Sequence, residues 1–443
     1  MIKKVSIREK IKAFSPFLYN LCSLILHPID RITFMWNLYR VPHLQKKALN
    51  KLYGKSKLNC VFLVTHYQSW KYEYVYKRML NHPRFSPVVV ICPITNFGKR
   101  KMIQHLSEGY FHFKSMGYNV LKAYDENSDK YINLEIELEP DIIFYTNPYK
   151  GVIDNRYYID NYLNYLTIYV SYNFGNNNDY QMFHNLSLHN LVWRLYAETE
   201  EHKRYSLNWA RNRGRNVVVS GYPGIEPLTR KDYKPSLIDW KIKDNSLKKI
   251  IWAPHHTIAP VRNVDYSCFI RYCDFMLALA DKYKDQVQFV FKPHPILRDN
   301  LDNIWGKEKT DAYYKKWLSK QNCSLNDGDY IDLFYTSDAM IHDCGSFIIE
   351  YLFMNKPVIR TLNNNSIDSM FNPFALNCLN QYYFAYNEQD IELFVNNVIN
   401  GVDPLKEQRT KFVNNVLMPK GSPSQNIIDD ILDSIDNQIL YRN

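Results

Sequence analysis

The sequence predicts two doubly wound α/β domains, each built on a parallel β-sheet with helices on both faces. The first observation is the length, because 443 residues are too many for one ordinary core and suffice for two. The second is a pattern of short, continuously apolar runs that alternate with helical stretches, as expected for strands buried on both faces of a parallel sheet. The third is a stretch rich in proline, lysine and aspartate, from Tyr222 to Asn245, which is typical of an interdomain linker.

The linker divides the apolar runs into two series, and each series predicts the strands of one sheet. The first series gives strands at Cys60–Val64, Val88–Cys92, Asp141–Tyr145, Thr167–Val170 and Val217–Val219. The second series gives strands at Lys249–Ala253, Val287–Phe291, Ala339–His342 and Pro357–Ile359. We therefore expect an N-terminal domain over residues 56–225 and a C-terminal domain over residues 226–425.

The two ends of the chain predict helices outside these domains. Residues 1–55 begin as a basic, amphipathic pattern in which Lys3, Arg8 and Lys12 alternate with apolar residues such as Ile7 and Phe14. Such a helix could lie on an anionic membrane or pack as a helical layer on the first domain, and both interpretations stay open. In residues 426–443 apolar residues recur at helical spacing, which predicts a helix that crosses back onto the first domain.

Composition restricts the partners and the compartment. The formal net charge of +10 favours anionic partners such as phosphates or acidic lipid headgroups. We expect no nucleic-acid partner, because no RNP-like motif, zinc-finger spacing or basic recognition helix is present. The eight cysteines form no CxxC pair and are typical of thiols in a reducing compartment. The apolar run from Phe17 to Leu26 is shorter than the roughly 20 residues that span a bilayer, so we expect a cytoplasmic protein, peripheral on the inner face of the cell membrane.

Polar residues follow three strands of the second series, at the sheet edge where ligands bind in open α/β folds. One strand continues into Asp343, Gly345 and Ser346 before an apolar helix begins. A glycine there lets backbone N–H groups face an anion, and the Ser346 hydroxyl adds a donor. This is the pattern of a phosphate cradle, although a plain helix N-cap explains the same residues. Glu350, one turn further, could accept hydrogen bonds from ribose hydroxyls or be a solvated carboxylate.

Histidines follow the other two strands. His294 is held between two prolines and, when protonated, could neutralise a diphosphate or protonate a leaving group, although such a run is also common in turns. His255 and His256 follow a neighbouring strand and favour a polar cleft. We expect His294 and His256 to act in catalysis. The expected substrate-binding residues are Lys292, His255, Thr257, Arg298, Asp343, Gly345, Ser346 and Glu350.

The sequence predicts neither a metal nor a cofactor. Asp327 and Asp329 are spaced like the DxD pair that holds a divalent ion in GT-A transferases. The pair directly precedes the predicted helix Ile331–Tyr335, however, so a turn or an N-cap explains it. No HExxH, Walker, GxSxG or GxGxxG motif is present.

Taken together, these motifs resemble those of the CDP-glycerol glycerophosphotransferases, the teichoic-acid-polymerase-like family of GT-B transferases. The residues in register with the family's C-terminal motif are Asp343, Ser346, Glu350, Asn355 and Pro357. Lys292–Pro295 resembles the family's histidine-proline element, Gly221–Pro223 its GYP turn and Trp252–Pro254 its strand end. The resemblance covers residues 215–362 well and the N-terminal half only in outline.

The resemblance implies a GT-B fold and a CDP-activated donor such as CDP-glycerol or CDP-ribitol. It implies transfer of the polyol phosphate to a glycan or lipid-linked acceptor at the cell surface. His294 and Ser346 would contact the donor phosphates, and Glu350 would lie near the nucleoside.

One departure from the family concerns the general base. Polymerases of the family have a histidine in a His-Gly-Thr run of the first domain, whereas the matching region here, Tyr169–Gly175, has none. His66 and His184 are candidates by position alone. Three hypotheses stay open: polyol-phosphate transfer, transfer from a nucleotide sugar in capsule or surface-glycan synthesis, and a non-catalytic role in a polysaccharide assembly complex.

Overall fold

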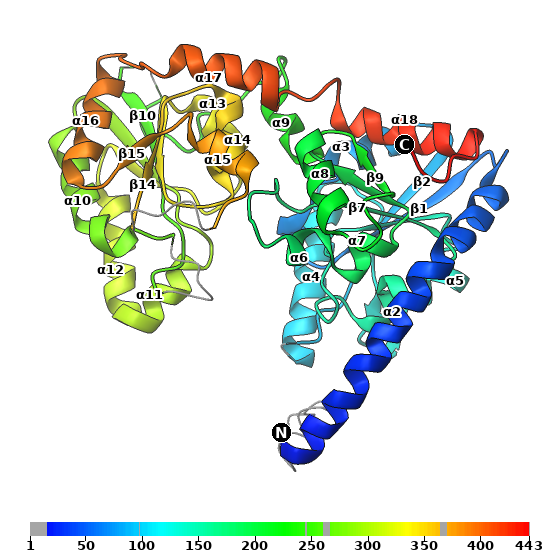
Figure 1. The fold of residues 1–443 in the computed structure, drawn as a ribbon. Coiled ribbons are helices and arrows are strands. Elements are labelled where there is room, and N and C mark those ends of the chain that lie inside the picture. The colour runs from blue at the N-terminus through cyan, green and yellow to red at the C-terminus, as the bar shows by residue number, and fades with distance from the viewer. Residues whose placement is uncertain (1–15, 97, 244–245, 260–265, 364–369, 443) are drawn as a thin grey trace. The chain divides into compact units, whose positions relative to one another are not determined.

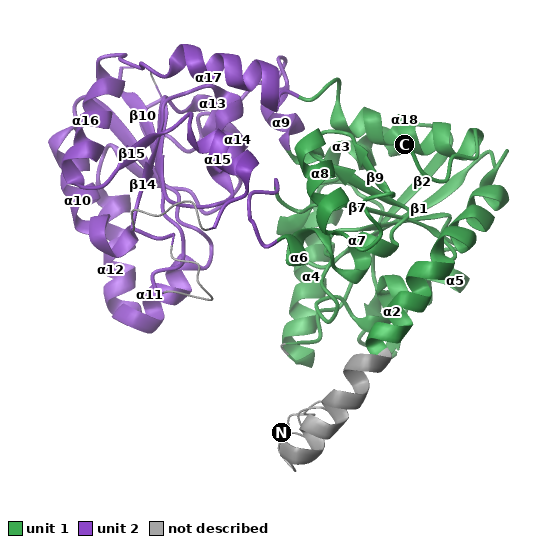
Figure 2. Cartoon of the chain, viewed as in Figure 1, with its two compact units in different colours: residues 1–173, 180–224, 419–443 green, residues 174–179, 225–418 purple. Residues whose placement is uncertain are grey.

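The chain forms two compact units that interleave in sequence. The computed structural model describes residues 16–96, 98–243, 246–259, 266–363 and 370–442, and the side chains of the first helix from residue 30 onward. Unit 1 comprises residues 1–173, 180–224 and 419–443, and unit 2 comprises residues 174–179 and 225–418 (Figure 2). Each unit is an α/β domain with a parallel sheet, so the predicted fold class is confirmed.

Unit 1 is built on seven parallel strands in the order β3-β2-β1-β6-β7-β8-β9 (Figure 1). Their bounds are β1 Leu58–Val64, β2 Phe85–Ile91, β3 Val120–Lys122, β6 Ile142–Tyr145, β7 Leu166–Val170, β8 Arg194–Ala197 and β9 Val217–Val219. Strands β4 (Tyr124–Asp125) and β5 (Lys130–Tyr131) form a separate antiparallel pair. The chain proceeds outward from β1 to β3 and then returns to place β6 beside β1. The topological switch point of this sheet therefore lies between β1 and β6.

The helices of unit 1 include one long N-terminal helix. Their bounds are α2 Pro16–Leu52, α3 Glu73–Leu80, α4 Lys99–Ser115, α5 Leu134–Glu137, α6 Tyr180–His184, α7 Ser187–Leu191, α8 Glu200–Trp209 and α18 Pro423–Asp436, with 3-10 turns at Tyr67–Ser69, Asn155–Tyr157 and Ile159–Asn161. No helix in the described part of the chain is both long and apolar enough to cross a bilayer. The basic pattern expected in residues 1–15 lies outside the described residues.

Unit 2 repeats the same topology with six parallel strands in the order β12-β11-β10-β13-β14-β15. Their bounds are β10 Lys248–Ala253, β11 Val287–Phe291, β12 Cys323–Leu325, β13 Ala339–His342, β14 Val358–Thr361 and β15 Tyr383–Ala385. The helices are α9 Glu226–Thr229, α10 Phe269–Lys282, α11 Leu297–Trp305, α12 Lys307–Ser319, α13 Ile331–Thr336, α14 Phe347–Glu350, α15 Pro373–Leu379, α16 Glu388–Ile399 and α17 Lys406–Phe412, with a 3-10 turn at Tyr351–Met354 and a π-turn at Val413–Leu417. The 3-10 turn Pro223–Ile225 begins in unit 1 and ends in unit 2. Here the switch point lies between β10 and β13.

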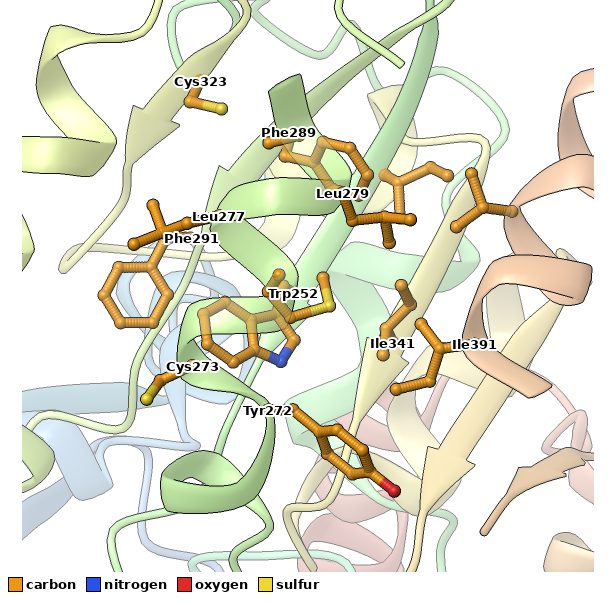
Figure 3. Close-up of a cluster of buried hydrophobic side chains, with 14 of the residues drawn as sticks. Trp252, Tyr272, Cys273, Leu277, Leu279, Phe289, Phe291, Cys323, Ile341 and Ile391 are labelled. Atoms are coloured by element: carbon orange, nitrogen blue, oxygen red, sulfur yellow. The ribbon is translucent and has the colours of Figure 1, made fainter. Parts of the chain in front are cut away.

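An aromatic core fixes the strands of unit 2 just before their carboxyl ends. The Trp252 ring of β10 stacks on Phe291 of β11 with 5.0 Å between the centroids (Figure 3). It also stacks on Phe269 of α10 at 5.7 Å. Trp317 of α12 stacks on the same Phe291 ring at 5.2 Å. Because these side chains are fully buried, the residues that follow β10 and β11 leave a rigid frame.

The units differ from the expected domain bounds at two places. Residues 419–425, expected in the C-terminal domain, belong to unit 1 together with the returning helix α18. Residues 174–179, expected in the N-terminal domain, belong to unit 2, although unit 1 residues flank them on both sides in sequence. Neither short excursion has a hydrophobic pattern that separates it from its neighbours in sequence, so periodicity alone does not reveal it.

Candidate functional site

The topological switch point of unit 2 brings together two of the predicted segments. Ala253 at the end of β10 pairs with His342 at the end of β13, so the following loops leave the sheet side by side. The backbone N–H of His255 donates to Asp343 Oδ1 at 2.5 Å. The edge of the sheet where ligands bind in this fold is therefore occupied by residues 255–257 and 343–346.

Asp343 connects these loops from inside the protein. Its side chain is 2% exposed, and Oδ2 accepts the backbone N–H of Cys268 at 2.6 Å. Burial raises the pKa of the Asp343 carboxyl to about 6, although the two N–H donors and nearby Arg360 favour its ionised form. The structure thus places Asp343 as a support for the His255 loop, where both oxygens have protein partners.

Three histidines gather beside this support. One ring nitrogen from each of His255, His256 and His294 lies within 4.8 Å of one from each of the others. The His294 ring centroid is 5.0 Å from that of His255 and 4.3 Å from that of His256. Burial, followed by the neighbouring cations, lowers the pKa of His255 to about 2 and that of His294 to about 4. These shifts favour the neutral imidazoles, whereas the sequence analysis considered a protonated His294.

The hydrogen bonds of His255 assign its tautomer. Thr257 Oγ1 accepts the backbone N–H groups of Tyr266 and Ser267 at 3.1 and 3.3 Å. With its lone pairs engaged, the Thr257 hydroxyl donates its proton to His255 Nδ1, 3.0 Å away. The neutral His255 ring consequently has its proton on Nε2.

Hydrogen bonds also bear on the tautomers of His294 and His256. His294 Nδ1 accepts the backbone N–H of Ile296 at 3.2 Å, which leaves the proton on Nε2. The Asn300 amide nitrogen of α11 donates to the His256 carbonyl at 2.8 Å and lies 3.5 Å from His256 Nδ1. Because Nδ1 is an acceptor in His255 and in His294, each of these two rings offers an Nε2–H donor. The histidine cluster (His255, His256 and His294) is suited to an anion.

The predicted phosphate cradle lies at the start of the short helix α14. Gly345 is buried, and a Cβ atom there would meet Tyr266 Cε2 at 3.3 Å, so the backbone passes close to its neighbours. Ser346 immediately precedes α14 and is exposed. The turn can present backbone N–H groups and a hydroxyl to an anion.

Glu350 and Lys292 make protein contacts in the interior. Glu350 is buried and accepts the Tyr330 hydroxyl at 2.5 Å, so it is not a solvated carboxylate. Lys292 Nζ donates to Asn326 Oδ1 at 2.7 Å and to the Gly328 carbonyl at 2.8 Å. Burial lowers the pKa of Lys292 to about 8. The structure gives both residues a part in holding the loop between β12 and α13.

Arg298 and Asp329 have protein partners of their own. Arg298 of α11 forms a 2.5 Å ion pair with Asp311 of α12, and both side chains are exposed. Asp329 Oδ1 accepts the N–H groups of Tyr330 and Ile331 at the start of α13, as expected of a turn.

The sequence analysis missed Arg360, which lies at the carboxyl end of β14. Its guanidinium is buried above the rings of Tyr266 and Phe371, at 5.5 and 5.3 Å, and donates to the Cys344 carbonyl at 3.0 Å. Within the described residues its Nε has no hydrogen-bond partner. A basic residue directly after the predicted strand Pro357–Ile359 was the available signal. Arg360 adds a fixed positive charge beneath the cradle.

In unit 1 the two candidate bases differ in position. His66 follows β1 at the switch point, is half-buried, and has its ring centroid 5.6 Å from that of His105 of α4. Burial and the neighbouring His105 lower the pKa of His66. His184 is buried against Ser206 Oγ at 3.0 Å, and burial lowers its pKa to about 3. Of the two, His66 is the one at a ligand-binding edge.

One family model matches the central part of the chain. Residues 171–366 match the family model described as CDP-Glycerol:Poly(glycerophosphate) glycerophosphotransferase. The match includes β10, β11, β13, β14 and the loops of the histidine cluster. No curated protein matches the chain.

Solved structures share the two-domain fold at low sequence identity. A histidine-to-asparagine variant of the wall teichoic acid polymerase TagF has a TM-score of 0.55 at 14% identity, covering 92% of this chain and 98% of that one. The same variant soaked with CDPG gives 0.51 at 16%, covering 95% and 98%. The S. aureus MnaA-UDP structure gives 0.53 at 16%, covering 87% and 98%. At these identities the likeness concerns the fold, which is of GT-B type. The family model that matches residues 171–366 is that of the family whose motifs the sequence resembles.

Proposed function

We propose that this protein transfers glycerol phosphate or ribitol phosphate from a CDP-activated donor to a hydroxyl of a teichoic-acid-like acceptor, and releases CMP. The acceptor oxygen forms a bond to the donor's β-phosphorus, and the bond from this phosphorus to the bridging oxygen breaks. The electron pair leaves with CMP, and the acceptor proton passes to a base. The observation that supports this most is the histidine cluster, because it gathers three imidazoles near the switch point of unit 2, within the residues that the family model matches.

The histidine cluster fits a diphosphate for electrostatic reasons. Three neutral N–H donors can bind phosphate oxygens without adding charge to a buried region that already contains Arg360. Negative charge grows on the bridging oxygen as CMP leaves, and preorganised donors stabilise this charge. A bound phosphate also favours protonation of a nearby imidazole, so His294 or His256 can then supply a proton to the leaving group.

A donor screen tests the proposal. The purified protein is incubated with CDP-glycerol, CDP-ribitol, UDP-sugars or CMP-sugars and a lipid-linked glycan acceptor, while nucleotide release and the product are followed by mass spectrometry. CMP release together with a phosphate-bearing product is the expected result. UDP release, or CMP release with transfer of a sugar but no phosphate, would instead establish a glycosyltransferase. Binding without turnover of any donor would establish a non-catalytic component.

For the base we propose His66, with its neutral imidazole accepting the acceptor's proton. Replacing His66 by alanine should lower kcat by about 10²- to 10⁴-fold, the range of general base catalysis. Added imidazole should restore part of the rate. His43→Ala is the matched control, because His43 is an exposed histidine of α2 in the same unit. Equal rates for His66→Ala and the wild type would exclude His66.

We propose that unit 1 docks on an anionic membrane through one face of α2. Ile32, Met35, Trp36 and Tyr39 recur at helical spacing and are 69%, 46%, 59% and 79% exposed. Arg211 lies at the edge of this face, with its guanidinium 3.9 Å from the Met35 sulfur. Aromatic side chains beside exposed cations are typical of helices that lie in the membrane interface.

The double substitution Trp36→Ala and Tyr39→Ala should weaken binding to vesicles that contain phosphatidylglycerol by about tenfold, because two aromatic side chains leave the interface. Cosedimentation measures this, with pure phosphatidylcholine vesicles for comparison. The control replaces Leu80 and Ile136, two exposed apolar residues elsewhere on unit 1, by alanine. Equal losses in the two double variants would argue against the α2 face.

A further inference from the structure

Residues 174–179 form a short strap that belongs to unit 2, although it follows β7 of unit 1 in sequence. The strap is fixed at the start of α15. The N–H of Asn372 donates to the Asn176 carbonyl at 2.9 Å, and its side-chain amide donates to the Gly175 carbonyl at 3.1 Å. Asn372 also caps α15 by accepting the N–H of Ala375 at 2.8 Å. Because one residue both caps a helix and binds the strap, the strap has a defined position in unit 2.

Further contacts hold the strap along its length. The ring of Phe174 stacks on Phe374 of α15 at 5.8 Å, with the rings nearly parallel. Asn177 forms an isolated antiparallel bridge with Phe371, and the N–H of Asn178 donates to the Met370 carbonyl at 3.3 Å. The strap is thus attached through its backbone and through a buried aromatic ring.

The side chain of Asn176 reaches the predicted phosphate cradle. It is buried, and its Nδ2 donates to the Gly345 carbonyl at 2.7 Å. The N–H of Ile348 donates to the same carbonyl at 3.2 Å. In a trans peptide the C=O and the following N–H point in opposite directions, so a carbonyl held toward Asn176 turns the N–H of Ser346 away from it.

We propose that Asn176 is a positioning residue for the donor's diphosphate, which it serves by orienting the peptide between Gly345 and Ser346. This inference rests on the proposed function and adds to it a residue from the sequence of the N-terminal half. The strap begins at the end of Tyr169–Gly175, the region that matches the His-Gly-Thr run of the family polymerases. In this chain the strap supports the donor site from within unit 2.

The test measures binding of CDP and of inorganic pyrophosphate by isothermal titration calorimetry, together with donor and acceptor KM values. Asn176→Ala should raise the Kd of both ligands about fivefold, the ratio that corresponds to one hydrogen bond of about 1 kcal/mol. The donor KM should rise by a similar factor, while the acceptor KM should stay at the wild-type value. A merely structural role would not separate the two KM values.

Two further variants keep the test decisive. Asn176→Asp preserves the shape of the side chain but places an oxygen against the Gly345 carbonyl, so it should weaken binding at least as much as alanine does. Asn178→Ala is the matched control, because Asn178 is an exposed asparagine of the same strap. If the wild type binds neither CDP nor pyrophosphate, the proposed function fails and this inference fails with it. If the wild type binds CDP and Asn176→Ala binds it equally tightly, only this inference is overturned.

Discussion

Replacing His294 by alanine is expected to abolish measurable transfer while the protein stays folded. His294 belongs to the histidine cluster at the switch point of unit 2, where its Nδ1 accepts the N–H of Ile296 and its Nε2–H is left as a donor. Loss of a preorganised donor to a developing phosphate charge costs about 10²- to 10³-fold in kcat, and loss of a proton donor to the leaving group costs a similar factor. The combined effect places the residual rate near the detection limit.

Steady-state release of CMP from CDP-glycerol measures this effect, and far-UV circular dichroism checks the fold. The matched control is His82→Ala, because His82 is a half-buried histidine of unit 1, outside the switch point. A His294→Ala rate within threefold of the wild type would remove His294 from the mechanism. His294→Gln keeps an N–H donor but cannot transfer a proton, so a partial rate in this variant would separate binding from proton transfer.

His294 also predicts a dependence of stability on pH. Burial, followed by His256 and Lys292, lowers the pKa of His294 from 6.5 to about 4. Between these two values the unfolded chain binds a proton that the folded protein does not. The contribution of His294 to stability is therefore complete above pH 6.5 and falls as the pH drops toward 4. His294→Ala should therefore lose less thermal stability than the wild type between pH 6.5 and pH 4.

The sequence predicted the strands whose composition is unambiguous. The runs that became β1, β2, β10 and β11 are continuous, apolar and rich in β-branched residues, and the structure buries them on both faces. Strands β3, β8 and β12 were not predicted, because each has only three or four residues and includes a polar side chain, such as Arg194 or Ser324. Those residues satisfy their hydrogen bonds through tertiary contacts that no local pattern specifies. Strands β4, β5 and β15 were not predicted because they have only two or three residues.

For the candidate site, the sequence indicated the loops better than the roles of their residues. The order of polar residues after strands predicted that His255 and Asp343 would meet, because the carboxyl ends of parallel strands share one edge. It did not predict that Asp343 and Glu350 would be buried with protein partners, since burial depends on elements far away in sequence. Asn176 could not be predicted at all. Its partner Gly345 lies 169 positions away, and no periodicity links the two.

Replacing Asp430 by alanine is expected to cause a large loss of stability in unit 1. Arg194 of β8 is 0% exposed, and its Nε donates to Asp430 Oδ2 of α18 at 2.9 Å. The same oxygen accepts the hydroxyl of Tyr196 at 2.8 Å, and Arg442 pairs with the other oxygen. Without the carboxylate, the Arg194 guanidinium stays buried with no counter-charge from this position, which costs about 3–5 kcal/mol when a buried pair loses one partner.

Asp433→Ala provides the matched control on the same helix. Asp433 pairs with Arg442 at the surface, with 47% of its side chain exposed, so its loss should cost less than about 1 kcal/mol. Urea unfolding followed by circular dichroism measures both variants, and hydrogen exchange of α18 shows whether this helix is released first. If both variants lose the same free energy of unfolding, the buried pair of Arg194 and Asp430 stabilises the protein no more than a surface ion pair does. A large loss for Asp430→Ala alone, with early exchange of α18, would show that this one carboxylate fixes the returning C-terminal segment to the sheet of unit 1.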